Sequence, residues 1–156
     1  QEYSLPLIII DMGTATTLSV INRNKQYLGG IIMPGVGVSH DSLIARTAQL
    51  PKIALEPPKH IIGKNTIDCM RAGIVFSNVD MIDGILDRME KELGETPTVC
   101  SLDGLIDRIQ AELGEPCTVV ATGGLATVIV PLCKHPMILD DDLLLKGLMI
   151  LYHRNQ

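Results

Sequence analysis

The stretch LIIIDMGTATT at residues 7–17 decides how this sequence folds. Its first four residues are all aliphatic, which is typical of a buried strand, and Asp11 and Gly13 then predict a tight turn where that strand ends. The alternating residues 16–21 and the segment 27–33 predict two further strands, separated by a short polar turn. Three consecutive antiparallel strands are therefore expected.

Apolar residues at helical spacing predict helices on both sides of a proline-rich segment. The first helix is expected to run from Ser39, a candidate N-cap, to a stop at Pro51, and the second is a long helix over residues 67–93. Residues 52–60 between them are expected to be extended and to add a strand. The remaining expected elements are a strand at residues 118–121 and a terminal helix at residues 141–153.

The composition predicts one globular α/β domain over residues 1–156. The chain is 46% hydrophobic but only 3% aromatic, so aliphatic side chains and methionines must fill its core. Its formal charge of -5 and the lack of a clustered basic face argue against a nucleic-acid partner. No apolar run reaches the roughly 18 residues that span a membrane, and a signal peptide's basic start is missing, so a cytoplasmic protein is expected. The four histidines and four cysteines show no spacing typical of metal ligands.

A tandem repeat lies between the long helix and the strand that follows it. Residues 83–100 and 103–120 are identical at ten of eighteen aligned positions, at an offset of twenty residues. Two copies are too few for a solenoid, so a local duplication within a globular fold is expected. Because the second copy leads directly into Thr122, we expect it to supply the core strand, and residues 94–114 to form an inserted loop and helix.

Residues 11–17, DMGTATT, have the composition of a cradle for a cation and a phosphate group. Gly13 lets the backbone approach a ligand, and the hydroxyl groups of Thr14 and Thr16 can donate to phosphate oxygens. Asp11 can hold a metal ion beside those charges. A plain turn followed by strand threonines fits the same residues, so the motif alone leaves both interpretations open.

Four further motifs accompany this one, namely GGIIMPG at 29–35, LP at 50–51, IGKNT at 62–66 and ATGGLA at 121–126. In this order and at these spacings the set resembles the type III pantothenate kinases. The resemblance implies an actin-like ATPase (ASKHA, ribonuclease H-like) fold of two α/β halves around an ATP cleft. It also implies a homodimer that binds pantothenate near the subunit interface. The implied reaction transfers the γ-phosphate of ATP to the 4′-hydroxyl of pantothenate, with Mg²⁺ and a monovalent cation, K⁺ or NH₄⁺, as the first step of coenzyme A biosynthesis.

The resemblance also implies roles for individual residues. Asp11 resembles the ligand of the monovalent cation, Thr14 resembles an ATP phosphate contact, and Thr66 resembles the threonine that contacts pantothenate. The implied ATP-binding residues are Gly13, Thr14, Thr16, Thr122, Gly123 and Gly124, of which the last three form a turn beside the adenosine. The implied pantothenate-binding residues are Gly63, Asn65 and Thr66. Without the resemblance, Thr66 is equally a helix N-cap, and the two glycines of TGG are equally a plain tight turn.

Two other motifs of the family, a D-x-G-N-T phosphate loop and a G-x-D-R motif that carries the general base, do not occur in this sequence. No catalytic residue is therefore assigned, and we expect the chain to be the C-terminal half of the enzyme, inactive without an N-terminal kinase half. Two alternatives stay open. One is a non-catalytic or engineered remnant that dimerises through the long helix without binding ATP, and the other is a different actin-like kinase or phosphatase.

Overall fold

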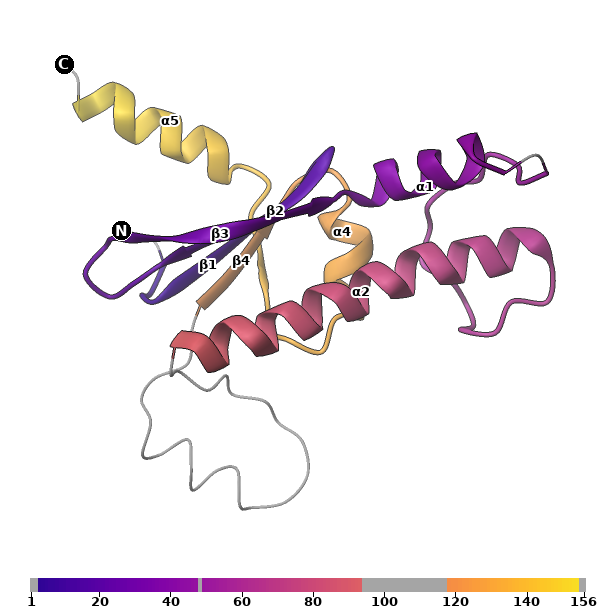
Figure 1. Ribbon diagram of the computed structural model, residues 1–156. Coiled ribbons are helices and arrows are strands. Elements are labelled where there is room, and N and C mark those ends of the chain that lie inside the picture. The colour runs from indigo at the N-terminus through magenta and orange to yellow at the C-terminus, as the bar shows by residue number, and fades with distance from the viewer. Residues whose placement is uncertain (1–2, 48, 94–117, 155–156) are drawn as a thin grey trace.

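A five-stranded sheet, in the order β3-β2-β1-β4-β5, forms the centre of the protein. The structure is a computed structural model that describes residues 3–47, 49–93 and 118–154 (Figure 1). The strands are β1 (Leu7–Met12), β2 (Ala15–Ile21), β3 (Tyr27–Pro34), β4 (Thr118–Thr122) and β5 (Ile138–Leu139). β1 pairs antiparallel with β2 and parallel with β4, and β2 pairs antiparallel with β3. The three antiparallel strands predicted from the sequence are confirmed.

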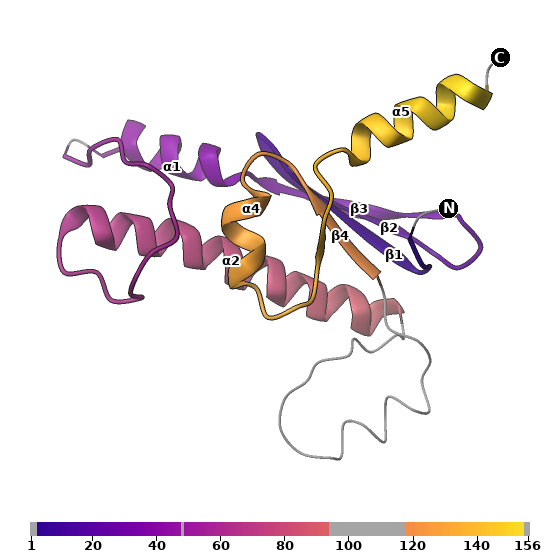
Figure 2. The same ribbon diagram turned by 180° about the vertical axis from the view of Figure 1, so that it is seen from behind.

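The helices are α1 (Val36–Ala45), α2 (Thr66–Leu93), α4 (Ala126–Ile129) and α5 (Leu143–Arg154), with a 3-10 turn, η1, at Val130–Leu132. Figures 1 and 2 show α2 and α4 on one side of the sheet, while α5 leaves the other side and points away from the body. The α/β class predicted from the sequence is confirmed. Within the described ranges, no helix is long and apolar enough to cross a lipid bilayer.

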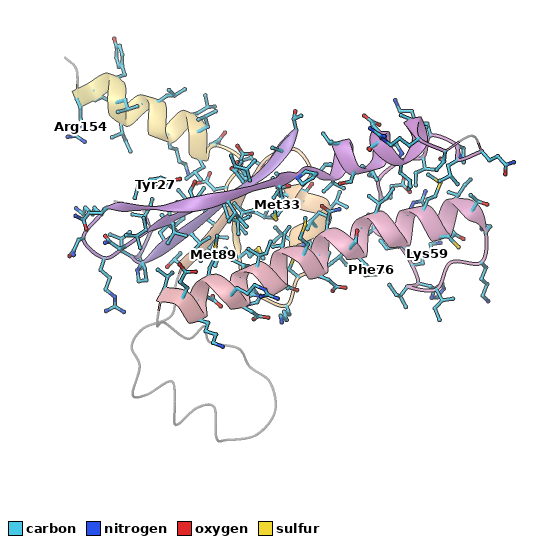
Figure 3. All side chains as sticks on the ribbon, in the orientation of Figure 1. Tyr27, Met33, Lys59, Phe76, Met89 and Arg154 are labelled. Carbon is cyan, nitrogen blue, oxygen red and sulfur yellow. The ribbon has the colours of Figure 1, made fainter. Side chains whose placement is uncertain are left out.

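The hydrophobic core lies between the sheet and α2. Its fully buried side chains include Ile8 and Ile10 of β1 and Val75, Ile82 and Leu86 of α2. Figure 3 shows Met33 of β3 and Met89 of α2 between the two layers. Because side chains alternate along a strand, Asp11 lies on the opposite face of β1 and is exposed. The core therefore fixes which residues the sheet presents on its other face.

The bounds of the first helix and one strand were predicted wrongly. α1 begins at Val36 with Gly35 as its N-cap and ends at Ala45, before Pro51. Ser39 lies within the helix, and its hydroxyl donates to the Gly35 carbonyl oxygen at 3.0 Å. Residues 51–65 belong to no strand, so the strand expected at residues 52–60 is missing. The prolines of that segment have no N–H to donate to a neighbouring strand, which explains an extended segment outside the sheet.

The tandem repeat is only partly described. Residues 83–93 of the first copy form the last turns of α2, and residues 118–120 of the second copy begin β4. The inserted loop and helix expected at residues 94–114 lie outside the described residues. The duplication within a single domain therefore stays a prediction.

We expect Leu86→Ala to lower the free energy of unfolding by about 2–5 kcal/mol, because Leu86 is 0% exposed and its truncation leaves a cavity. The control is Arg88→Ala, at an exposed position of the same helix, which should change stability by less than about 0.5 kcal/mol. Urea denaturation followed by circular dichroism measures both. Equal losses would contradict the buried face that the structure gives α2.

Candidate functional site

Three turns meet at the carboxyl ends of β1 and β4. They are the β1–β2 turn at Gly13 and Thr14, the β3–α1 turn at Gly35, and the β4–α4 turn at Gly123 and Gly124. The parallel pairing sets Asp11 opposite Thr122, so residues from the two ends of the sequence become neighbours. The carboxyl ends of strands are also where open α/β sheets bind ligands.

Gly123 brings the third turn against the end of β1. Its φ is +101°, and a Cβ atom at this position would lie 2.7 Å from backbone atoms of Met12. A side chain would meet both a strained backbone conformation and a steric clash, so only glycine fits. The β4–α4 turn therefore packs backbone to backbone on β1.

Gly35 supports the first turn in the same way. Its N–H donates to the carbonyl oxygen of Thr14 at 3.1 Å, and a Cβ atom on Gly35 would overlap the carbonyl oxygens of Gly13 and Thr14. The Thr14 carbonyl is thus used within the protein, while Thr14 itself is exposed. This arrangement holds the turn in place and leaves the Thr14 hydroxyl open to a ligand.

Asp11 carries an exposed carboxylate beside the glycine turn. Asp11 Oδ1 lies 3.7 Å from the position that a Cβ atom on Gly13 would take. Because Gly13 has no side chain, nothing at that position shields the Asp11 carboxylate. None of the described basic side chains forms an ion pair with Asp11. An unneutralised carboxylate at such a turn fits a cation, because hard cations take oxygen ligands.

Thr16 does not share the face of Asp11. It is only 1% exposed and lies on the core side of β2, whereas Thr17 stands opposite Asp11 on the other face. This position of Thr17 was predictable from the sequence. Successive side chains of a strand alternate between its two faces, and the apolar residues at 18 and 20 share the face of Thr16, so Thr17 points away from the core. In the hairpin, residues 12 and 11 pair with residues 16 and 17. The hydroxyl that accompanies Asp11 is therefore that of Thr17.

The residues predicted to bind pantothenate lie at the start of α2, away from the three turns in both views (Figures 1 and 2). Asn65 caps this helix: its Oδ1 accepts from the Asp68 N–H at 2.9 Å, and its Nδ2 donates to the Asp68 carboxylate at 2.7 Å. The N-cap is thus Asn65, and the alternative interpretation of Thr66 as the cap is wrong. Thr66 is the first helical residue and is exposed.

A pocket of about 370 Å³ opens beside the start of α2. Its basic lining residues are Lys59, His60, Lys64 and Arg71. Of the three predicted substrate residues, Gly63 lines the pocket, and Asn65 and Thr66 do not. Glu56 Oε2 lies 3.6 Å from Arg71 Nη2, and Asp68 adds a second carboxylate to the lining. Lys59, Lys64 and Arg71 still exceed the two acids by one positive charge, and this small excess favours an anionic ligand.

Sequence spacing gave His135 no role, yet the structure buries it against α2. Its Nδ1 lies 2.9 Å from a carboxylate oxygen of Asp83, 52 positions earlier in the sequence. No local pattern predicts a contact across such a separation. The neighbouring Cys133 stays a thiol, because burial, followed by the charges of Asp83 and Asp80, raises its pKa to about 12.

Comparison with known proteins gives a consistent result. The sequence model of the family described as "Type III pantothenate kinase" matches residues 1–88. A type III pantothenate kinase of Bacillus cytotoxicus is 42% identical over 99% of this chain and 52% of its own length, and one of Brevibacillus brevis is 39% identical over 100% and 53%. The chain spans about half the length of the curated relatives it matches.

A solved structure described as a conserved putative Baf family transcriptional activator from Campylobacter jejuni has a TM-score of 0.55 to this chain at 18% identity. The match covers 98% of this chain and 60% of that one, and it shows a likeness of fold alone. The family match itself places the chain in the actin-like ATPase class of α/β proteins. The chain belongs to the type III pantothenate kinase family, a family of kinases, as the sequence motifs predicted.

We expect Gly123→Ala to lower the free energy of unfolding by at least about 2 kcal/mol, because the added Cβ meets the Met12 backbone at a positive φ. Gly124→Ala is the matched control. A Cβ there has nothing within 4 Å, so its effect should stay within about 1 kcal/mol. Urea denaturation measures both, and a harmless Gly123→Ala would refute the close packing of this turn on β1.

Proposed function

We propose that this chain is the C-terminal half of a pantothenate kinase, which transfers the γ-phosphate of ATP to the 4′-hydroxyl of pantothenate in the first step of coenzyme A biosynthesis. The meeting of Asp11, Thr14 and the Gly123 turn at one edge of the sheet carries this proposal. In it, Thr14 contacts the phosphates and the turn of Thr122, Gly123 and Gly124 lies beside the adenosine. Phosphoryl transfer requires positioning and charge neutralisation rather than covalent chemistry from the protein, so a preformed cradle is a suitable contribution.

Two kinds of cation belong to the proposed reaction. We assign Asp11 to the monovalent cation, K⁺ or NH₄⁺, because its carboxylate is exposed and pairs with no described basic side chain. Mg²⁺ accompanies the phosphates of ATP and neutralises the charge that develops on them. Thr17, opposite Asp11 on the same face, adds a hydroxyl oxygen beside the proposed cation.

The position of Thr66 favours a homodimer. The first turn of α2 lies away from the nucleotide cradle, so Thr66 cannot serve the cradle of its own chain without a large rearrangement (Figures 1 and 2). We propose that it contacts pantothenate in the cleft of a second copy, near the subunit interface. Pantothenate carries a carboxylate, and the basic pocket beside Thr66 suits such an anion.

The general base, in this proposal, comes from an N-terminal kinase half outside residues 1–156, and these residues alone are inactive. The chain spans about half of its relatives' length. α5 has no buried residue and exposes large apolar side chains, among them Leu144, Met149 and Ile150. An apolar surface of this kind is normally covered by another part of a protein, which suits an N-terminal half docked on α5. We place the assembled enzyme in the cytoplasm.

Calorimetry with MgATP in potassium buffer tests the nucleotide site. The sample is this chain mixed with the part of the Bacillus cytotoxicus relative that it does not cover. We expect binding, and we expect Asp11→Asn to weaken it roughly tenfold or more, because a charged contact contributes about 1.5–3 kcal/mol. Asp41→Asn, which removes the same charge from an exposed position on α1, should bind as the unmodified chain does. Absence of MgATP binding in the mixture would favour the non-catalytic remnant.

Thr66→Val tests the pantothenate contact in the same mixture. We expect the KM for pantothenate to rise about tenfold while the free energy of unfolding changes by less than about 0.5 kcal/mol, because Asn65 caps the helix instead. Thr47→Val, at another exposed threonine, should leave KM unchanged. Asn65→Ala should cost about 1 kcal/mol of stability. A Thr66→Val enzyme with a normal KM would remove Thr66 from the substrate site.

A further inference from the structure

A buried histidine and three carboxylates form a second polar cluster, on the side of the sheet covered by α2. We call it the His135 cluster, and it consists of His135 with Asp83, Asp87 and Glu90 of α2. The three acids recur at helical spacing, so they share one face of α2. The side chains of His135 and Glu90 are each 1% exposed. Charged groups buried this deeply are retained only with partners, so the cluster requires an explanation.

Asp83 fixes the orientation of the imidazole ring. Its carboxylate accepts from His135 Nδ1 at 2.9 Å, from the His135 backbone N–H at 3.3 Å and from the Lys134 backbone N–H at 2.9 Å. An ionised carboxylate only accepts, so Nδ1 carries a hydrogen, and Nε2 is the nitrogen that can bind a ligand when the ring is neutral. This is the arrangement in which an outer carboxylate orients a histidine that binds a metal through its other nitrogen.

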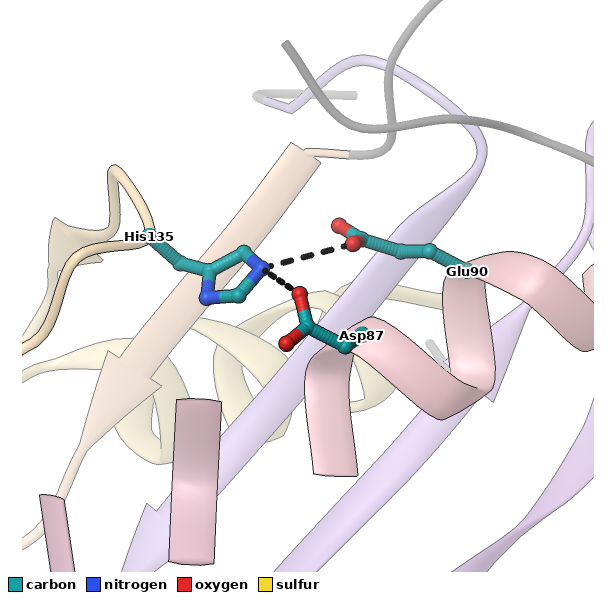
Figure 4. Close-up of side chains that lie close together, drawn as sticks. All are labelled: Asp87, Glu90 and His135. Carbon is teal, nitrogen blue, oxygen red and sulfur yellow. Dashed lines mark ion pairs between the residues drawn. The ribbon is translucent and has the colours of Figure 1, made fainter. Parts of the chain in front are cut away.

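His135 Nε2 faces two more carboxylates. Figure 4 shows Asp87 and Glu90 reaching the same nitrogen of His135 from successive turns of α2. Asp87 Oδ1 lies 3.2 Å and Glu90 Oε2 lies 3.5 Å from Nε2. Nevertheless, Nε2 and Glu90 Oε2 are buried atoms with no hydrogen-bond partner among the described residues. No hydrogen bond of good geometry joins Nε2 to Glu90, whereas a cation between the three atoms would satisfy all of them.

The spacing of the three atoms fits a metal ion. Ligands bound to a tetrahedral ion at about 2.0–2.1 Å lie about 3.3 Å apart, close to the two separations found here. One ligand atom from each of Asp87, Glu90 and His135 lies within 4.8 Å of the other two. One imidazole nitrogen and two carboxylate oxygens are a donor set that suits zinc and similar divalent transition metals.

The charges of the cluster also call for a divalent ion. Asp83, Asp87 and Glu90 contribute three negative charges, and Lys134, whose Nζ lies 2.8 Å from Asp87 Oδ2, contributes one positive charge. With a neutral His135, one divalent cation brings the sum to zero. The Asp87 side chain is 45% exposed, which leaves a route for the ion and a place for water as a fourth ligand.

We propose that Asp87, Glu90 and His135 bind one zinc-class divalent metal ion, with Asp83 as the positioning residue of His135. The ion would fasten the segment after η1 to the last turns of α2, which end at Leu93. A comparison of the two copies of the tandem repeat supports a metal site in the first copy. The second copy retains the two aspartates as Asp103 and Asp107 but has Gln110 where the first has Glu90, so it lacks one of the three acids.

The test is metal titration after removal of bound ions with a chelator. The Glu90 and Asp83 carboxylates raise the pKa of His135, although burial acts in the opposite direction. A proton on His135 therefore competes with the metal ion for the imidazole nitrogen, and the titration is done at mildly alkaline pH. Calorimetry with Zn²⁺ should show one ion per chain, bound with micromolar or tighter affinity. Co²⁺ should give the visible absorption of a tetrahedral site, and Zn²⁺ should raise Tm.

Glu90→Gln and Asp87→Asn should each weaken Zn²⁺ binding at least tenfold, and Asp83→Asn by about 10–100-fold. Asp87→Asn acts at the exposed side of the cluster, so it keeps the test valid if Glu90→Gln does not fold. Glu92→Gln, at an exposed position of the same helix, is the control and should bind Zn²⁺ normally. Absence of Zn²⁺ and Co²⁺ binding, or equal losses from Glu92→Gln and Asp87→Asn, would overturn the proposal and leave a protonated His135 as the cation of the cluster.

Discussion

The parallel pairing of β1 with β4 is the interaction on which the rest of this structure depends. β1 is the central strand, hydrogen-bonded to β2 on one side and to β4 on the other. Parallel neighbours cannot be joined by a tight turn, so the chain between them must cross the sheet, and α2 in that crossover covers one face. The register of the pair sets Asp11 beside Thr122 and presses Gly123 onto Met12. The candidate nucleotide cradle is thus a consequence of strand register.

α2 carries a polar region at each of its ends, the predicted pantothenate contact at its start and the His135 cluster at its last turns. Its apolar face supplies the core, and its first turn carries Asn65 and Thr66, while its last turns hold the carboxylates around His135. Glu90 is the unusual member, because a fully buried carboxylate is costly unless a cation compensates its charge. Burial of this kind distinguishes the cluster from the exposed acids that are common on helix surfaces.

The surfaces that stay open agree with family membership. α5 projects from the body with no buried residue, and the start of α2 is exposed beside a basic pocket. Both features suit a protein whose relatives are about twice as long as this chain. The candidate nucleotide cradle also opens on the face of the sheet opposite α2, where Asp11 and Thr17 lie. The proposed site between two halves would need such a face to be free.

The first three strands, α2, β4, α5 and the family were all predictable from the sequence. Periodicity, turn residues and short motifs are local properties of a chain, so they can be recognised without a structure. Prediction from the sequence placed Ser39 wrongly at a helix start and left Thr66 open as a cap, since cap choice depends on one side-chain hydrogen bond that several neighbouring residues could make. The position of Thr17 opposite Asp11 belongs to a short hairpin, and strand alternation in the sequence was sufficient to predict it. Only the tertiary structure decided the contact between His135 and Glu90, which joins residues far apart in the sequence through helix packing, and no local pattern encodes it.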